Sequence, residues 1–106
     1  MNRLMIIARL AEGAHDEAEE LLRRGPPFDP EALGLHRHAA YLTADEVVFI
    51  FEAPDVEWTV NDLLDDLTLA PAVVRWDKLV EGIPRIAHEC FYWSRETNKF
   101  GVGLGT

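Results

Sequence analysis

The chain has 106 residues, of which 48% are hydrophobic and 27% charged, and its formal net charge is −9. A chain of this length buries one core rather than two, and its apolar content excludes an intrinsically disordered protein. The negative charge argues against nucleic acid or an anionic membrane surface as a partner, because both attract clusters of Lys and Arg. We expect a single domain over residues 1–93 and a flexible C-terminal tail over residues 94–106, where glycines alternate and little can be buried.

A cytoplasmic location is expected. The N-terminal apolar run is interrupted by Arg9 and followed by acidic residues, so a signal peptide is not predicted. No stretch approaches the roughly 18 apolar residues that span a bilayer. Cys90 is the only cysteine, which excludes an internal disulfide and a cysteine-based zinc cluster.

The first two predicted elements are a buried strand over residues 3–10 and a helix over residues 14–24. The strand is a short, nearly continuous apolar run. The helix begins with acidic residues and ends with basic ones, which complements its dipole. Glu19 and Arg23 form a favourable pair four residues apart, and Gly25 stands where a left-handed cap belongs.

The second half of the chain predicts a hairpin, two short helices and a last strand. The hairpin strands cover residues 34–43 and 47–53 and are joined by a tight polar turn. The other elements are a helix opened by Pro54, a short helix from about Pro71 to Gly82-Ile83-Pro84, and a strand over residues 85–93.

This order predicts the α+β class and a ferredoxin-like βαββαβ arrangement, with a four-stranded antiparallel sheet and helices on one face. The strands do not alternate apolar with polar residues, since Ile6 and Ile7, like Phe49 and Ile50, are neighbours that point to opposite faces. Both faces of the sheet therefore need cover, and the helices suffice for one. Because a bare apolar face exceeds what soluble monomers expose, we expect a two-fold homodimer packed sheet to sheet.

The chain carries two sets of short motifs. The first runs His38-Ala39-Ala40-Tyr41-Leu42, Trp58, Arg75-Trp76 and Phe91-Tyr92-Trp93, a layout that resembles the L-rhamnose mutarotases. The second is Ala8-Arg9, Gly34-Leu35-His36-Arg37-His38 and Phe91-Tyr92, which resembles the aromatic polyketide cyclases. Both families, like the antibiotic-biosynthesis monooxygenases, belong to the dimeric α/β-barrel superfamily. The resemblance covers roughly residues 3–93 as a pattern of elements and implies a dimeric α/β barrel.

The full catalytic motifs of these families are not present. Gly25 follows Arg23-Arg24, where mutarotases of this kind have a catalytic His, and Leu21 occupies the position of their Tyr. Glu31-Ala32-Leu33 stands where the cyclases have Pro-His before the glycine. The resemblance thus implies the scaffold and leaves the reaction open.

The candidates for chemistry are polar side chains in otherwise apolar strands. His36 and His38 are two residues apart on one predicted strand and so share a face, where they could bind a metal or move protons near neutral pH. The alternative is a partly solvated edge strand. The catalytic candidates are His36, His38, Arg9 and Tyr41, and the ligand-binding candidates are Trp58, His88 and Tyr92.

Two of these candidates have competing interpretations. Arg9 shares a face with Met5 and Ile7, which we assign to the barrel interior, so we expect it to be buried and to need a partner. That partner is Glu89, an Asp or an anionic ligand, and the competing interpretation is an intrachain ion pair near the strand end. His88 lies on the last predicted strand. It either approaches His36 and His38 of the other copy to form a three-histidine metal site, or is a hydrogen-bonded histidine without a ligand.

No motif for a nucleotide, a phosphate, a metalloprotease or a nucleophile elbow is present, so we predict neither a cofactor nor a metal. The first hypothesis is a protein that binds a small organic molecule between sheet and helices, with cofactor-free isomerisation, cyclisation or oxygenation as candidate reactions. A haem-dependent variant through His88 or His36 is a weaker version of it. The alternative is a non-catalytic dimeric binding or assembly module, so enzyme activity is left open.

Overall fold

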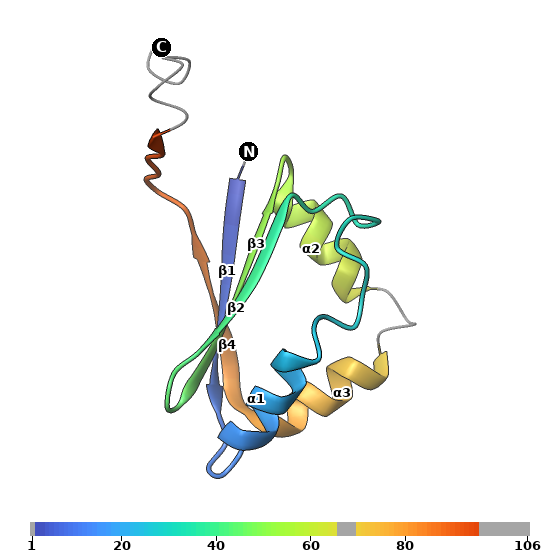
Figure 1. The fold of residues 1–106 in the computed structure, drawn as a ribbon, viewed down its shortest axis with the longest axis vertical. Helices are drawn as coiled ribbons and strands as arrows, with labels where there is room; N and C mark the ends of the chain where they lie inside the picture. Colours follow the sequence, from blue (N-terminus) through green and yellow to red (C-terminus); the bar gives the residue numbers. More distant parts are fainter. Residues whose placement is uncertain (1, 66–69, 96–106) are drawn as a thin grey trace.

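Four strands and three helices are found in residues 2–65 and 70–95, the part of the chain that the computed structural model describes. The elements are β1 (Asn2–Leu10), α1 (His15–Arg23), β2 (Arg37–Leu42), β3 (Glu46–Ala53), α2 (Val56–Leu64), α3 (Ala70–Leu79) and β4 (Val80–His88). The strands form one antiparallel sheet in the order β2-β3-β1-β4. The helices lie together on one side of this sheet (Figure 1). The protein therefore belongs to the α+β class.

Helix α1 is stabilised by the local interactions that its sequence predicts. Arg23 donates to Glu19 at 3.0 Å and Arg24 donates to Glu20 at 2.6 Å, each pair four residues apart. Gly25 follows with φ of 87°, a left-handed conformation that a side chain would strain. The predicted end of this helix is confirmed.

The core lies between the sheet and the helices. On the two central strands, Leu4 is paired with Phe51 and Ala8 with Val47, and all four are buried on the face that meets the helices. Helix α2 covers the first pair with Val56, Val60 and Leu63, and helices α1 and α3 cover the second with Ala18 and Leu79. Strands β1 and β3 match the strands predicted over residues 3–10 and 47–53.

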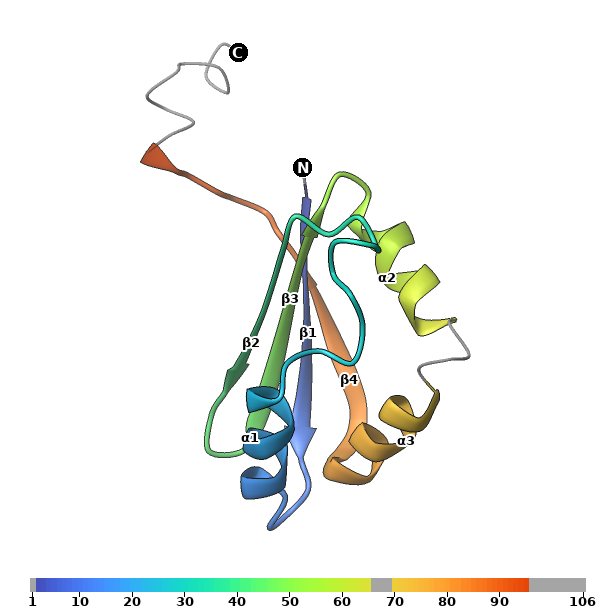
Figure 2. The same ribbon diagram turned by 45° about the vertical axis from the view of Figure 1, so that its right-hand side comes forward.

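The opposite face of the sheet is not covered by the described helices, as two views of the ribbon show (Figures 1 and 2). We call it the open face. Strand pairing arranges its side chains in four rows across the sheet. The two middle rows are mainly apolar and contain Ala39, Ile50, Met5 and Ala87, then Tyr41, Val48, Ile7 and Arg85. A sheet face exposed to water is normally polar, so these apolar rows indicate a surface that is covered in use.

The two outer rows of the open face are charged and neutralise themselves. Their ion pairs, together with that of Arg85, are Arg3–Glu52, Arg3–Glu89, Arg37–Glu52, Arg9–Glu81 and Arg85–Glu46. Within the described residues, the four arginines and four glutamates of this face cancel, whereas the whole chain carries −9. The excess acidic residues therefore lie elsewhere.

The last strand differs from its prediction. Strand β4 begins at Val80 and ends at His88, so Gly82-Ile83-Pro84 lies inside the strand rather than at the end of a helix. The pairing with β1 shifts register between Ile7, which is opposite Arg85, and Arg9, which is opposite Glu81. The extra residues of β4, Gly82-Ile83-Pro84, are accommodated at this shift. The predicted strand over residues 85–93 was wrong in its second half. Of the predicted tail, residues 96–106 lie outside the described residues.

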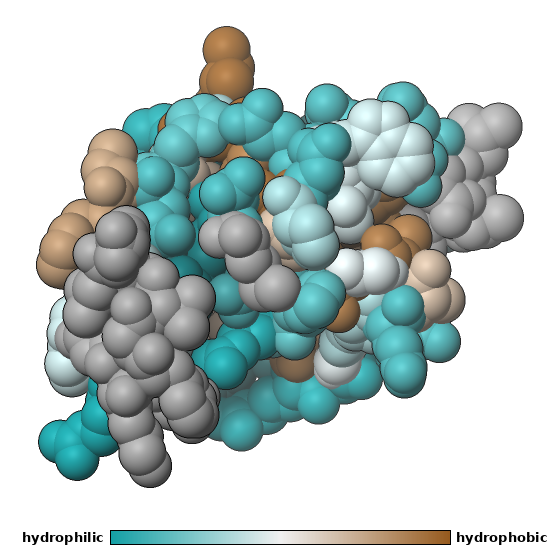
Figure 3. Space-filling model, turned by 90° about the horizontal axis from the view of Figure 1, so that it is seen from above, coloured by the Kyte–Doolittle hydropathy of each residue, from teal (hydrophilic) through white to brown (hydrophobic). Residues whose placement is uncertain are grey.

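Hydrophobic side chains are scattered at the end of the molecule that carries the N-terminus. A space-filling view from this end shows a mainly hydrophilic surface with separate hydrophobic residues near its margins (Figure 3). None of the helices in residues 2–65 and 70–95 is long and apolar enough to cross a membrane.

Candidate functional site

His38 is the predicted site residue with the most distinctive environment. It lies on β2 opposite Phe51 and faces the helices. Its ring stacks on Phe51 at a centroid distance of 4.6 Å and meets Phe28 at 5.3 Å in a tilted contact. Nδ1 lies 3.0 Å from the carbonyl oxygen of Ile50. Because a carbonyl only accepts, Nδ1 carries the proton, and Nε2 of the neutral ring is left with a free lone pair.

Burial also keeps this histidine uncharged. Desolvation lowers the pKa of His38 below its ordinary value, and the hydrogen bond to Ile50 offsets only part of that effect. The imidazole is therefore neutral at physiological pH, with Nδ1 donating to the backbone. A neutral imidazole with a free Nε2 can accept a hydrogen bond or a proton from a bound molecule.

This burial makes stability depend on pH. The unfolded chain, where His38 has its ordinary pKa of about 6.5, takes up a proton more readily than the folded chain. The contribution of His38 to the free energy of unfolding is thus constant well above that pH and falls as the pH drops toward the lower pKa of the folded state. Urea denaturation at pH values from about 7.5 to 5 measures the slope. We expect His38→Asn, which retains a donor near the position of Nδ1, to remove part of it.

The matched control for that measurement is His36→Asn. His36 is two residues away and exposed, so its replacement removes an imidazole without touching the packing of His38. An equal loss of slope in both variants would contradict the assignment to His38.

The other three catalytic candidates do not join His38 within the chain. His36 precedes β2, is exposed, and donates its backbone N–H to the carbonyl of Glu52 at 2.8 Å. Tyr41 is exposed on the open face, opposite Val48. The expectation that His36 lies on the same strand as His38 was wrong, because the strand starts one residue later.

Arg9 is neither buried nor paired with Glu89. Its side chain is 67% exposed at the far end of β1, and its Nε lies 3.4 Å from Glu81. On β1, Arg9 is five residues from Leu4, which lies in the same row as His38, so the two rows are about 16 Å apart along the strand. Arg9 also faces the opposite side of the sheet. The interpretation as an intrachain ion pair near the strand end is the one that the geometry matches.

The side chains of His88 and Trp58 are exposed near the first turn of α2, outside the core. Nδ1 of His88 is 3.1 Å from Oε1 of Glu57, the first-turn residue of α2 that precedes Trp58. Both members of this pair are exposed, and the Trp58 side chain is 65% exposed. Such an exposed pair contributes at most about 1 kcal/mol. Strand β4, which carries His88, is the sheet edge opposite β2.

Tyr92 belongs to a charged cluster that the sequence did not single out. The guanidinium carbon of Arg3 lies 3.5 Å from the centroid of the Tyr92 ring. Arg3 also donates to Glu89 at 2.7 Å and pairs with Glu52 at 2.9 Å. Burial opposes the charge of Arg3, but the two carboxylates and Tyr92 outweigh it and raise the pKa of Arg3. The guanidinium of Arg3 is thus permanently charged and holds Glu52, Glu89 and Tyr92 together.

Glu52 is the buried member of this cluster. It is only 6% exposed, and its Oε1, which no hydrogen bond reaches, lies 3.3 Å from Nε of Arg37. A carboxylate at this depth requires compensation from both arginines. A single acid inside the apolar run of residues 47–53 was the signal in the sequence from which a buried ion pair could have been predicted.

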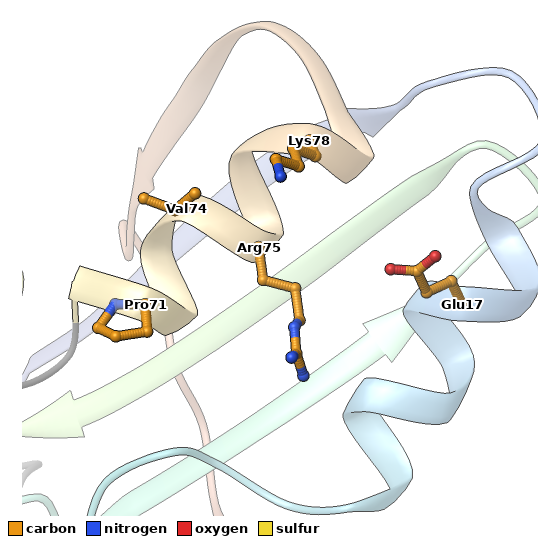
Figure 4. A pocket seen from close by; sticks show the side chains of 5 residues that line it. All are labelled: Glu17, Pro71, Val74, Arg75 and Lys78. Atoms are coloured by element: carbon orange, nitrogen blue, oxygen red, sulfur yellow. The ribbon is translucent and has the colours of Figure 1, made fainter.

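A hollow between α1 and α3 is distinct from all these residues. It has a volume of about 610 Å³ and is lined by Glu17, Pro71, Val74, Arg75 and Lys78. In the close-up, Arg75 and Glu17 extend from facing helices toward the space between them (Figure 4). Its charged lining is solvent-exposed and it contains none of the predicted site residues, so it does not resemble a pocket that encloses an apolar ligand.

Metal sites and relatives give no further assignment. Within residues 2–65 and 70–95, no group of three or more His, Cys, Asp or Glu side chains is placed to hold a metal ion. No known family model matches the sequence, and a search of curated proteins finds no similar protein.

Proposed function

We propose that the protein has a ferredoxin-like fold and forms a homodimer of the dimeric α/β-barrel type. The sheet order β2-β3-β1-β4 supports the fold, with α2 and α3 together taking the place of the second helix of the βαββαβ pattern. The apolar middle rows of the open face support the second copy as their cover. Because this face has no net charge, two strongly acidic chains can meet there without bringing their excess negative charges into contact.

Within this dimer, we propose that a small organic molecule binds between sheet and helices at His38. The observation that carries the proposal is the free Nε2 of a neutral imidazole held between Phe28 and Phe51. The loop between α1 and β2 adds Leu33 and Leu35, which are only partly buried against the same core. A planar molecule with a hydroxyl donor, such as a phenol or an enol, complements this site, whereas an ion would be disfavoured by the apolar surroundings.

Binding rather than a defined reaction is the proposed activity. Isomerisation, cyclisation or cofactor-free oxygenation requires a second polar group near the bound molecule. Arg9 and Tyr41, on the open face, would instead lie in the space between the two copies. In this proposal the protein is cytoplasmic and uses no cofactor. The chemistry that remains available to it is proton transfer through Nε2 of His38.

A non-catalytic dimeric assembly module is the second candidate. The observation that favours it is the dispersal of the polar candidates, since His36, Arg9 and Tyr41 are exposed at three separate places. Under this alternative, the neutral open face is the functional surface and His38 is a structural residue of the core.

Imidazole NMR with two probes separates the candidates. We expect beta-naphthol and benzoylacetone to shift the Nε2 resonance of His38 in the wild-type protein. His38→Asn removes the acceptor but retains the backbone contact, so it is expected to weaken binding of both probes roughly tenfold. His36→Asn is the control and is expected to bind them normally. Absence of wild-type binding, or equal binding by His38→Asn, would overturn the site and favour the assembly module.

A further inference from the structure

The chain leaves the sheet after β4 on the side away from the helices. Both ribbon views show this segment passing beyond the end of the sheet on the side of the open face (Figures 1 and 2). We call residues 89–93 the arm. It contains three consecutive aromatic residues, Phe91, Tyr92 and Trp93.

The base of the arm is fastened to the open face. Glu89 accepts a hydrogen bond of 2.7 Å from Arg3, and the same guanidinium lies over the ring of Tyr92 at 3.5 Å. Arg3 is itself paired with the buried Glu52, its neighbour in one of the two outer rows of the open face. The cation–π contact and the ion pairs share one guanidinium, so together they favour one direction for the arm.

The two neighbours of Tyr92 have no such cover. Phe91 is 83% exposed and Trp93 is 58% exposed. Two large exposed aromatic side chains on either side of a fastened residue are typical of interface anchors, because they bury much area at little cost in rotamer entropy. Their place beside the open face brings them next to whatever covers that face.

We propose that the arm clasps a second copy of this chain, with Phe91 and Trp93 as its anchors. This inference rests on the proposed homodimer. A partner seated on the neutral open face lies on the side toward which the arm projects, and two-fold symmetry makes each copy both clasp and be clasped. The acidic charge of the whole chain favours this face for self-association, since the open face combines apolar rows with cancelled charges.

Sedimentation equilibrium of the full chain tests the clasp with three proteins. The double variant Phe91→Ser/Trp93→Ser is expected to raise the dimer dissociation constant roughly tenfold or more. Trp58→Ser is the matched control, because it removes a tryptophan of similar exposure from α2, and it is expected to leave that constant unchanged. A dimeric wild type whose dissociation constant is the same in the double variant would overturn the clasp and leave the homodimer standing. A wild type that is monomeric at every concentration would overturn both.

Tryptophan fluorescence gives a second readout that does not depend on removing the anchors. In Trp58→Phe/Trp76→Phe, Trp93 is the sole tryptophan. Its emission is expected to shift to shorter wavelength as the dimer forms, because the ring leaves water. The dilution midpoint should agree with that from sedimentation. Emission that stays the same while the mass doubles would overturn the clasp.

Discussion

Replacing Ile50 by aspartate is expected to convert a homodimer into a monomer of 12.0 kDa. Ile50 lies in a middle row of the open face, between Ala39 on β2 and Met5 on β1. In the proposed dimer, its replacement buries a carboxylate without a partner, which costs several kcal/mol, and two-fold symmetry introduces that cost twice. Light scattering coupled to size-exclusion chromatography measures the mass.

The control for this prediction is Val74→Asp. It adds the same charge to an exposed valine on α3, in the layer that faces away from the open face, and should leave the dimer intact. Circular dichroism has to show that Ile50→Asp is folded. Tyr41→Asp changes a more exposed position on the same face and is the second variant in case it is not. A folded Ile50→Asp or Tyr41→Asp that remains dimeric would place the interface elsewhere.

The local features of the fold could be predicted because local residues determine them. The end of α1 follows from Glu19, Arg23 and Gly25, all within one short stretch. The two-sided apolar character of β1 and β3 follows from the period of two in a strand, which places Ile6 and Ile7 on opposite faces whatever the neighbours are. Neither inference needs knowledge of strand order.

The last strand could not be placed from local signals. Gly82 and Pro84 normally interrupt regular structure, so the chain around them predicts a turn. Both are tolerated in β4 because it is an edge strand, where one side has no neighbouring strand that needs the N–H donor that proline lacks. The register of β4 against β1 also shifts at this point. Edge position is a property of the whole sheet, which a reading of residues 80–88 alone does not contain.

The grouping of the candidate site residues could not be predicted either, because it too depends on the whole sheet. The sequence identifies His38, Arg9 and Tyr41 as polar residues in apolar strands, but strand register decides which of them meet. Pairing with β3 sets His38 opposite Phe51 and Tyr41 opposite Val48, three residues apart and therefore on opposite faces. The partners of Arg3 are likewise brought together by register, from positions as distant as Glu52 and Glu89.

Replacing Phe51 by alanine is expected to lower the free energy of unfolding by about 3–5 kcal/mol. Phe51 is buried between Leu4 and the α2 residues Val56 and Val60, and its ring supports one side of His38. The substitution leaves a cavity that the helix layer can only partly close. It also hydrates His38, so the pKa of that histidine should return toward its ordinary value. Urea denaturation and an NMR titration of the imidazole measure the two effects.

Val74→Ala is the control for both measurements, made at the same protein concentration so that dimerisation contributes equally to each. It removes methyl groups that are already 55% exposed, and the expected change in stability is within about 0.5 kcal/mol. A loss below about 1 kcal/mol for Phe51→Ala would mean that the sheet and α2 do not share the core described above. A normal loss of stability with no rise in the pKa of His38 would show that the ring of Phe51 holds the core but does not shield the imidazole. Because the two readouts move separately, the experiment distinguishes the packing role of Phe51 from its part in keeping Nε2 of His38 unprotonated.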